Sequence, residues 1–464
     1  MSAYTQLCAR LLFPLHERLK QHDSVARRQA LEQSQWLPAE ALQDLQLQRL
    51  RGFLRHVGQH VPYYRQMFKG LGFDPGALRS VADLQALPLL GKAQIRAHLD
   101  ALKAEGHGPL ARYTTGGSSG EPLIFYIGKD RSSHDVAAKW RATRWWGVDI
   151  GDTELVVWGS PIELGSQDRL RRLRDGLMRS HLLPAFEMSP ASLDRYVAEI
   201  ERRRPRMLFG YPSSLSLIAA HAAARGRRLD QLGIRVVFVT SEKLYDSQRE
   251  TIGRVFGCPV ANGYGARDAG FIAHECPAGS LHISAEDIVV ETVTPEGRPA
   301  AAGEVGEIVV SHLATQDFPM LRYRTGDMGL LGRQPCACGR GLPVLAEVQG
   351  RSTDFVVARD GTVMHGLALI YTLRDLPGVE GFRIEQLSLD ETEVQVVAGP
   401  GFDDQARARI VRDFQARLGA GVAVTIRQVA QIAPEASGKY RYVLSRVAPA
   451  ASAALATEAE VDHA

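Results

Sequence analysis

The chain has 464 residues, 45% of them hydrophobic, and its 55 basic and 52 acidic side chains leave a formal net charge of +3. This length can bury one large core and a second, smaller one. The nearly balanced charge gives no electrostatic reason to expect binding to nucleic acid or to a membrane surface. The N-terminal apolar residues are interrupted by Pro14 and by charges at Arg10, Glu17 and Arg18. They therefore predict neither a signal peptide nor a membrane span, and we expect a cytoplasmic protein.

Residues 1–105 are predicted to be mainly helical. Leucines recur at helical spacing from Leu42 to Leu54, and the segment Val61–Tyr64 (VPYY) interrupts the pattern. Further along, arginines at 169, 171, 172 and 174 continue to Arg179. We interpret this basic run as the solvated face of an amphipathic helix, with a nucleic-acid patch as the alternative.

The middle of the chain alternates between strand and helix patterns. Strands are predicted at 125–127, 155–158 and 235–240, and helices at 191–203 and 246–256. This rhythm is typical of parallel strands covered by helices. From residue 283 the segments DIVVETV and GEIVVSHL alternate apolar and polar residues, which predicts half-buried antiparallel strands. The fold class is therefore α/β, with a large N-terminal domain of mixed, mainly parallel sheets.

A second strand and helix rhythm starts after Gly350 and predicts a separate, small α+β domain over 351–447. Its strands are expected near 354–358, 381–387 and 392–398, and its helices near 366–376 and 403–418. The N-terminal domain then covers 1–350. The alanine-rich tail, 448–464, has little that could pack, and we expect it to be disordered.

Tyr113–Pro122 (YTTGGSSGEP) combines three glycines with four hydroxyl side chains. Such a loop lets backbone N–H groups approach phosphate oxygens closely. It is not a Walker A sequence, because no lysine follows the last glycine. The alternative is a flexible surface loop.

Four further motifs carry chemistry. Ala261–Gly270 (ANGYGARDAG) follows a predicted strand, where ligands bind in parallel sheets; Tyr264 offers a flat surface for a base and Asp268 a hard oxygen for magnesium. In Tyr323–Asp327 (YRTGD), the carboxylate behind a glycine can accept both hydroxyls of a ribose. QGRS at 349–352 lies at the expected domain boundary, and ASGKYRY at 436–442 places Lys439 in a glycine-containing loop.

Taken in order, these motifs, with PYYR at 62–65 and TSEKL at 240–244, resemble the adenylate-forming superfamily of acyl-CoA synthetases, luciferases and peptide-synthetase adenylation domains. The phenylacetate-CoA ligase-like branch, with its capsule-biosynthesis relatives, is the most similar. The resemblance covers nearly the whole chain and implies a mobile C-terminal domain, ATP and magnesium as cofactors, and coenzyme A as the acceptor.

The resemblance also implies individual roles. Lys439 bridges the substrate carboxylate and the α-phosphate, Asp268 binds magnesium, and Arg351 lies near the ribose and α-phosphate. Asp327 binds the ribose. The remaining nucleotide-binding residues belong to the phosphate loop and the adenine slot: Thr114, Thr115, Ser118, Ser119, Gly120, Ser241, Glu242, Asn262, Gly263, Tyr264 and Gly265.

Three departures from the family pattern stand out. The phosphate loop lacks a lysine that many members carry, which puts its cationic contribution in doubt. Asp268 replaces the usual glutamate and is one methylene shorter, and Thr353 stands at the hinge position that often carries aspartate or lysine. The sequence therefore leaves the hinge rotation unsettled.

Cys276, His282, Cys336 and Cys338 form a predicted structural zinc site. Three thiolates and an imidazole are a common zinc set, and four protein ligands leave no open position for catalysis. Buried free cysteines are the alternative interpretation. His274 is the rival fourth ligand.

Three functions remain open from the sequence. The first is an AMP-forming ligase that passes the acyl group of a small carboxylic acid to coenzyme A. The second is an amide ligase that acylates an amine in surface-polysaccharide or secondary-metabolite biosynthesis. The third is a non-catalytic scaffold. No nucleic-acid partner or membrane span is expected, and the oligomeric state is open.

Overall fold

The computed structural model of the protein describes residues 2–114, 123–158, 169–185, 190–351, 355–360, 363–365, 367–374, 376–432 and 443–447. The chain divides into two compact units. The first comprises Met1–Thr292, Ala300–Thr325 and Gly329–Val348, and the second Val293–Pro299, Gly326–Met328 and Gln349–Ala464. Among the described residues, no helix combines the length and apolar character that a membrane span needs.

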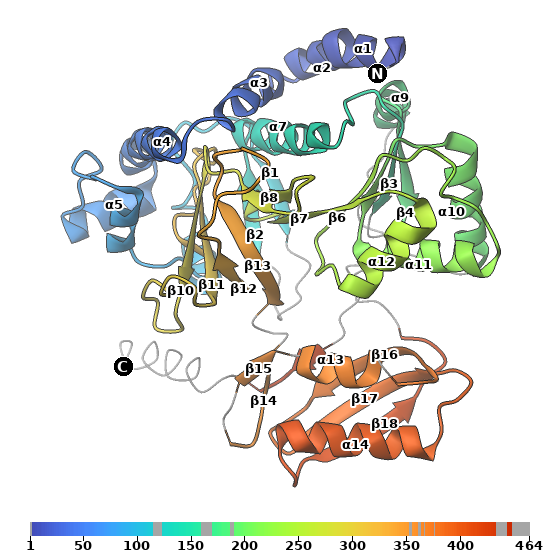
Figure 1. Ribbon diagram of the computed structural model, residues 1–464. Helices are drawn as coiled ribbons and strands as arrows, with labels where there is room; N and C mark the ends of the chain where they lie inside the picture. The colour runs from blue at the N-terminus through green and yellow to red at the C-terminus, as the bar shows by residue number, and fades with distance from the viewer. Residues whose placement is uncertain are drawn as a thin grey trace. The chain divides into compact units, whose positions relative to one another are not determined.

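The first unit begins with helices. They are α1 (Ala3–Leu7), the π-helix η1 (Cys8–Leu12), α2 (Phe13–Leu19), α3 (Ser24–Ser34), α4 (Ala39–His60), α5 (Pro62–Leu71), the 3₁₀-helix η2 (Val81–Ala86) and α6 (Lys92–Ala97) (Figure 1). The predicted interruption at VPYY is the junction of α4 and α5. Pro62 starts α5, where its fixed φ suits the first helical turn, and Gly72 ends it with a φ of +62°.

A large mixed sheet forms the body of the first unit (Figure 1). Its strands are β3 (Glu154–Trp158), β4 (Ser180–Pro184), β5 (Met207–Gly210), β6 (Val236–Thr240), β7 (Val260–Ala266), β8 (Gly270–Glu275), β9 (Leu281–Ile283), β10 (Ile288–Val293), β11 (Gly306–His312), β12 (Tyr323–Leu331) and β13 (Val344–Arg351). The order is β10-β11-β12-β13-β9-β8-β7-β6-β5-β3-β4, and a separate hairpin joins β1 (Ala111–Thr114) to β2 (Ile124–Ile127).

The parallel part of this sheet follows the predicted rhythm. Strands β4, β3, β5, β6 and β7 pair in parallel, and β8 and β9 continue the sheet antiparallel. Helix α7 (Lys129–Trp145) precedes β3, and the helices between the parallel strands are α9 (Arg169–Leu177), α10 (Pro190–Arg203), α11 (Pro212–Ala224) and α12 (Asp246–Phe256). All five residues of β6 are buried, as an apolar run between two helical layers requires. The predicted α/β class is confirmed.

The prediction that the GEIVVSHL segment is half-buried is wrong, because every residue of β11 is buried. The polar residues of this strand face protein partners instead of water. Glu307 pairs with Arg324 at 2.5 Å, and the Ser311 hydroxyl accepts the backbone N–H of Arg322 at 2.8 Å. Ile308 and Val310 pack into the apolar core, while the polar groups of Glu307 and Ser311 are paired inside the protein, so the alternation does not indicate a solvent-exposed face.

The second unit contains a four-stranded sheet in the order β18-β17-β16-β19. Its elements are β14 (Phe355–Val357), β15 (Val363–His365), α13 (Leu367–Arg374), β16 (Val379–Gln386), β17 (Glu391–Ala398), α14 (Asp404–Leu418), β18 (Ala423–Gln428) and β19 (Val443–Ser445). Asp403 caps α14 by accepting the backbone N–H of Ala406 at 2.8 Å, and Ile410, Phe414 and Leu418 are fully buried. A small α+β unit at the C-terminal end is confirmed.

Candidate functional site

The carboxyl edge of the parallel strands brings two of the predicted nucleotide-binding segments together. Ser241 and Glu242 directly follow β6, and Asn262–Gly265 lie in β7. The parallel register pairs Val239 with Asn262 and Thr240 with Gly263, so the two segments run side by side. This edge is the usual ligand position in sheets of this kind.

Local backbone conformation shapes this edge. Ser241 has a φ of +71°, in the left-handed region that a non-glycine residue seldom adopts. The Glu242 carboxylate accepts the backbone N–H of Ser213, at the start of α11, at 3.2 Å. Gly265 allows close approach, since a Cβ there would lie 2.3 Å from the carbonyl oxygen of Gly270. The turn after β6 is therefore held to a neighbouring helix in a strained conformation, as binding loops often are.

Asp268, the predicted magnesium ligand, lies in the turn between β7 and β8. Its Oδ2 accepts a hydrogen bond from the Tyr323 hydroxyl at 2.6 Å, and its backbone carbonyl accepts one from Arg131 at 3.5 Å. Arg131 also donates to the carbonyl of Arg267 at 3.2 Å. Asp268 is thus positioned from both its side chain and its backbone.

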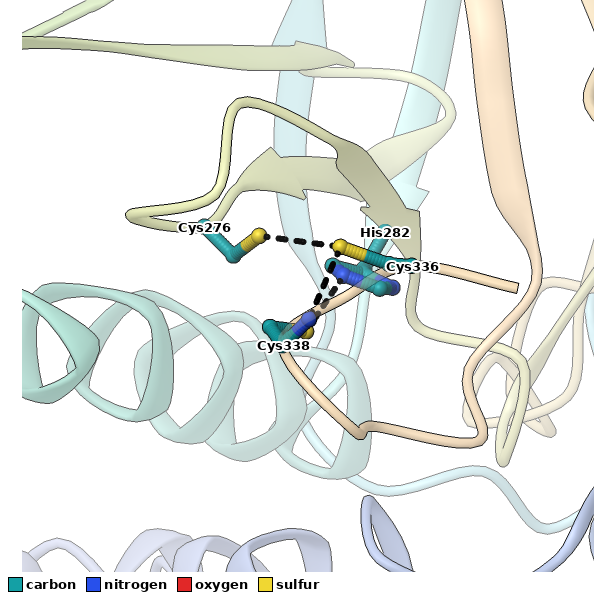
Figure 2. Close-up of side chains that lie close together, drawn as sticks. All are labelled: Cys276, His282, Cys336 and Cys338. Atoms are coloured by element: carbon teal, nitrogen blue, oxygen red, sulfur yellow. Dashed lines mark hydrogen bonds between the residues drawn. The ribbon is translucent and has the colours of Figure 1, made fainter. Parts of the chain in front are cut away.

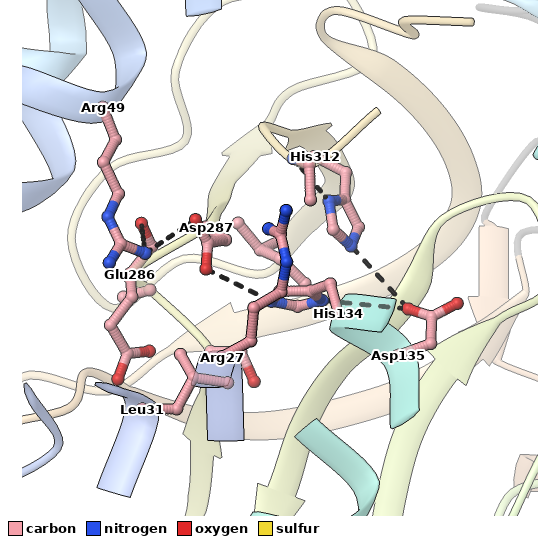
Figure 3. A network of polar contacts seen from close by, with 12 residues as sticks. Arg27, Leu31, Arg49, His134, Asp135, Glu286, Asp287 and His312 are labelled. Carbon is pink, nitrogen blue, oxygen red and sulfur yellow. Dashed lines mark hydrogen bonds and ion pairs between the residues drawn. The ribbon is translucent and has the colours of Figure 1, made fainter. Parts of the chain in front are cut away.

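The ion-pair partner of Arg131, Asp135, belongs to a buried polar network with His134, Asp287 and His312 (Figure 3). The Nε of Arg131 lies 3.0 Å from each oxygen of Asp135, one turn later on α7. Asp135 faces His312 on β11, with 3.8 Å between Nε2 and Oδ1, while His134 lies 3.5 Å from Asp287. Although burial opposes ionisation of Asp135, the Arg131 guanidinium and the imidazoles hold its pKa well below the usual range.

His134, Asp135 and His312 lie close enough to resemble a metal site, but their hydrogen bonds do not fit one. The Nδ1 of His312 accepts the backbone N–H of Ala314 at 3.2 Å, which places the ring proton on Nε2. The Nε2 atom, which faces Asp135 at 3.8 Å, therefore carries the proton and has no lone pair to offer a metal, and the Arg131 cation already pairs with the carboxylate. Burial lowers the pKa of His312 to about 3, which keeps the ring neutral. We assign this cluster to positioning the Asp268 turn.

Neither Arg131 nor its ion-pair partner Asp135 is predicted as a site residue from the sequence. Arg131 and Asp135 are four residues apart in a helix, a spacing that predicts an ion pair and nothing more. Their link to the turn at Asp268 spans 137 residues and exists only in the folded chain. The spacing of residues in the sequence therefore does not predict the contact between Arg131 and the turn at Asp268.

Of the other predicted functional residues, the structure describes some, and the rest lie outside the described residues. Thr114 is the exposed last residue of β1, and Asp327 is half-buried in β12, next to Gly326 with a φ of +76°. Arg351 is the last residue of β13. Outside the described residues lie Thr115, Ser118, Ser119, Gly120, Thr353, Lys439 and the tail 448–464.

The four predicted zinc ligands come together from the turn after β8, from strand β9 and from the loop between β12 and β13 (Figure 2). Their ligand atoms all lie within 4.8 Å of one another, although Cys276 and Cys336 are 60 residues apart. The Sγ atoms of Cys276 and Cys336 are 3.6 Å apart, and the Sγ of Cys338 lies 3.2 Å from Nε2 of His282. Tetrahedral zinc, with bonds of about 2.3 Å to sulfur and 2.0–2.1 Å to nitrogen, separates its ligand atoms by roughly 3.5–3.8 Å. The donor set and its spacing fit zinc.

The protonation state of His282 also fits a metal ligand. Its Nδ1 lies 3.1 Å from the carbonyl oxygen of Leu342, an acceptor, so Nδ1 carries the proton and the Nε2 lone pair faces the cysteines. Burial lowers the pKa of His282, which favours the neutral ring that a metal requires. Burial raises the pKa of Cys276 to about 11, so this thiol must lose its proton when a metal binds.

His274, the rival fourth ligand, lies outside the cluster. Its ring stacks on Phe271 at 5.4 Å between centroids and is fully buried. Neither ring nitrogen has a hydrogen-bond partner in the part of the chain that the structure describes. Burial lowers its pKa to about 3, so it packs as a neutral, nearly apolar ring.

Comparison with known proteins gives consistent matches. Residues 178–315 match the AMP-binding enzyme family, and residues 356–446 match the CapK C-terminal domain family. The chain is 26% identical to a phenylacetate-coenzyme A ligase of Thermus thermophilus over 440 residues, covering 88% of this chain and 97% of the relative. It is 23% identical to protein CapK of Staphylococcus aureus over 415 residues, covering 87% and 89%.

Solved structures share the fold. The crystal structure of 2-hydroxyisobutyryl-CoA ligase in the postadenylation state matches with a TM-score of 0.72 at 21% identity, covering 93% of this chain and 94% of that one. ATP-bound MatB from Rhodopseudomonas palustris matches with a TM-score of 0.53 at 16% identity, covering 74% and 67%.

Proposed function

The chain belongs to the adenylate-forming ligases, in the phenylacetate-CoA ligase-like group, and from this membership we propose that it activates a small carboxylic acid with ATP and transfers the acyl group to coenzyme A. Membership in this enzyme family sets the non-catalytic scaffold aside. The observation that carries the proposal is the doubly held Asp268 beside the paired edges of β6 and β7.

In the first half-reaction, a carboxylate oxygen of the acid attacks the α-phosphorus of ATP. The bond from the α-phosphorus to the bridging oxygen breaks, and pyrophosphate leaves with that electron pair. An ionised acid has no proton to lose, so the protein has to position the reactants and stabilise negative charge. Magnesium, when bound, would neutralise phosphate charge.

Within this proposal, each residue has a defined task. Asp268 would hold magnesium, and Asp327 accepts hydrogen bonds from the ribose hydroxyls. Lys439 and Arg351 stabilise charge around the α-phosphate. The phosphate loop (Thr114, Thr115, Ser118, Ser119 and Gly120) and the adenine slot (Ser241, Glu242 and Asn262–Gly265) bind the rest of the nucleotide.

In the second half-reaction, the sulfur of coenzyme A attacks the acyl carbonyl. The thiol proton is lost, the bond from the carbonyl carbon to the phosphate oxygen breaks, and AMP leaves. An amine acceptor, giving an amide instead of a thioester, is the second candidate. We retain the amine acceptor as a candidate because residues 356–446 match the CapK C-terminal domain family and the chain is similar to protein CapK.

The cysteine–histidine cluster completes the proposal as a structural zinc site. Four protein ligands leave no position for a substrate, so the metal would tie the loop at Cys276 to the loop at Cys336 and Cys338.

Acid-dependent pyrophosphate exchange into ATP tests the first half-reaction across a panel of carboxylic acids. Lys439→Ala should abolish the exchange while leaving ATP binding intact, and the exposed Lys69→Ala should exchange like the wild type. Exchange with no acid in the panel would count against the proposal, as would near-normal exchange by Lys439→Ala.

The acceptor is tested separately with the best acid of the panel. Coenzyme A and a set of primary amines are offered in turn, and the products are identified by mass spectrometry. A thioester formed at a rate matching the exchange supports the coenzyme A proposal. An amide formed while coenzyme A stays unreacted assigns the second candidate instead.

A further inference from the structure

The N-terminal helical segment Ala3–Leu19, made of α1, η1 and α2, points its leucines outward. Leu7, Leu11, Leu15 and Leu19 have exposed fractions of 43%, 57%, 53% and 77%. They recur every four residues, so they lie along one side of the segment. Scattered single leucines on a surface are ordinary, but an aligned row is not.

The inward side of this segment carries polar side chains, and hydrogen bonds attach it to the rest of the protein. Thr5, Cys8 and Glu17 are the buried residues of the three pieces. The Thr5 hydroxyl donates to Oδ1 of Asp152 at 2.9 Å, and the Glu17 carboxylate accepts the Ser24 hydroxyl. Surface helices normally bury their apolar side and expose the polar one. Here that orientation is reversed and held in place by buried hydrogen bonds.

The π-helix keeps the leucines in a row. In a regular α-helix, residues four apart drift steadily around the axis because each turn takes 3.6 residues. The wider turn of η1, Cys8–Leu12, cancels part of that drift between Leu7 and Leu15. The apolar row therefore extends along the whole segment.

Helix α9 lies against the same segment. The Tyr4 hydroxyl donates to the carbonyl of Leu177 at 2.8 Å, and the Cys8 thiol donates to the same oxygen at 3.5 Å. Leu173 and Leu177 of α9 are 62% and 46% exposed. Among the described residues, six of the ten strongly exposed large hydrophobic side chains belong to these two neighbouring elements.

The charges around the leucines are basic. Arg10, Arg18 and Lys20 are exposed, whereas the only acidic residue of Ala3–Leu19, Glu17, is buried. The sequence of α9 contains four arginines and one aspartate. A two-fold contact between copies of this face would bring like charges together, which opposes self-association. Exposed leucines flanked by basic residues match a bilayer surface with anionic headgroups.

We propose that the segment Ala3–Leu19, together with α9, docks the enzyme on a membrane surface that carries anionic lipids. The leucines would enter the boundary between headgroups and acyl chains while the basic side chains face the headgroups. The overall charge of +3 conceals this local arrangement.

Cosedimentation of the full chain with vesicles tests this inference. Vesicles of phosphatidylcholine alone are compared with vesicles that also contain phosphatidylglycerol, at low and high salt. We expect binding to the anionic vesicles that weakens as salt rises. Leu11→Gln/Leu15→Gln should weaken this binding about tenfold or more, because two leucines no longer enter the apolar layer.

The matched control is Leu71→Gln/Leu217→Gln, which removes two exposed leucines far from this face along the chain and should bind like the wild type. Unchanged pyrophosphate exchange by both variants verifies that they fold. Wild-type protein that ignores anionic vesicles overturns the inference, as does equal binding after the Leu11 and Leu15 changes. A dimer in light scattering that dissociates in the Leu11→Gln/Leu15→Gln variant, without vesicle binding, would assign the face to a second copy and also overturns it.

Discussion

The Tyr323 hydroxyl lies 2.6 Å from Oδ2 of Asp268, joining two motifs that are 55 residues apart in the sequence. Tyr323 begins β12 and is 1% exposed, so its ring cannot move away without disturbing the core. The hydrogen bond fixes the orientation of the Asp268 carboxylate. In the proposed magnesium role, this orientation matters more for Asp268 than for a glutamate, because the aspartate side chain is one methylene shorter.

Tyr323→Phe should therefore lower the rate of pyrophosphate exchange by about 10- to 100-fold, with the loss partly recovered at higher magnesium, because a ligand that loses its supporting hydrogen bond binds metal more weakly. The measurement is exchange rate against magnesium concentration. Tyr196→Phe removes another buried hydroxyl, one that donates to the carbonyl of Pro184 at 2.6 Å, and should leave the magnesium dependence unchanged. A normal magnesium dependence in Tyr323→Phe would contradict the positioning role.

Asp327→Ala should weaken ATP binding by about 10- to 100-fold, through loss of charge-assisted hydrogen bonds to the ribose. Isothermal titration calorimetry with ATP and magnesium measures the change. Asp390→Ala, which removes an exposed carboxylate paired with Arg359, is the control. Equal affinity in Asp327→Ala would remove this residue from the nucleotide site.

Protein purified without chelator should contain close to one zinc per chain in plasma emission spectrometry. Cys336→Ser, Cys338→Ser and His282→Ala should each lower the zinc content and the melting temperature, because binding free energy at a structural site is also folding free energy. Zinc binding to metal-free protein should release protons, since the Cys276 thiol, with a pKa of about 11, is protonated at neutral pH.

His274→Ala is the matched control for the zinc site. It removes a buried imidazole from the strand next to His282, so it should cost stability but keep the zinc. Zinc loss in His274→Ala with retention in His282→Ala would exchange the two roles. Metal-free wild type of unchanged stability would make the cysteines ordinary packing residues.

The buried His312 should make stability depend on pH. Its pKa is about 3 in the folded state and about 6.5 when unfolded, so the unfolded chain binds a proton first as the pH falls. This stabilising contribution is complete above pH 6.5 and should shrink by about 2 kcal/mol by pH 5. Urea unfolding at pH 7 and pH 5 measures it. His312→Asn keeps an acceptor for the Ala314 N–H and should show a smaller fall; an identical fall would contradict this account.

The ion pair of Arg141 and Glu286 is fully buried, with 2.7 Å between Nη1 and Oε1. Arg141→Ala would leave the Glu286 carboxylate without its cation in the interior, which should cost about 3–5 kcal/mol. The urea unfolding midpoint measures the loss. Arg202→Ala, from the largely exposed pair with Glu199, should hardly move that midpoint. A similar small shift for both variants would show that water reaches Glu286.

Much of the fold was decided by short-range patterns. The apolar run of β6 predicted a strand buried on both faces, because only a sheet with two helical covers can hold it, and the interruption at VPYY predicted the start of α5. The composition of the cysteine and histidine segments also predicted a set of zinc ligands. For the strand and the helix start, the necessary information lies within a few neighbouring residues, whereas the zinc set combines two short segments that are 60 residues apart.

The strand order of the sheet decides which histidine lies beside the cysteines, which the sequence left open. From the sequence, His274 and His282 were both plausible ligands, because each lies within six residues of Cys276. In the structure they sit opposite each other on β8 and β9. The loop that carries Cys336 and Cys338 leads into β13. Because β13 pairs with β9 through Val344 and His282, this pairing brings the two thiols close to His282. Likewise, the hydrogen bonds that position Asp268 come from Tyr323 and Arg131, which are distant in the sequence. The outward direction of the leucines also depends on which distant elements pack against their helices. Side-chain direction and long-range neighbours follow from tertiary packing, because burial is a property of the assembled sheet and not of any one segment.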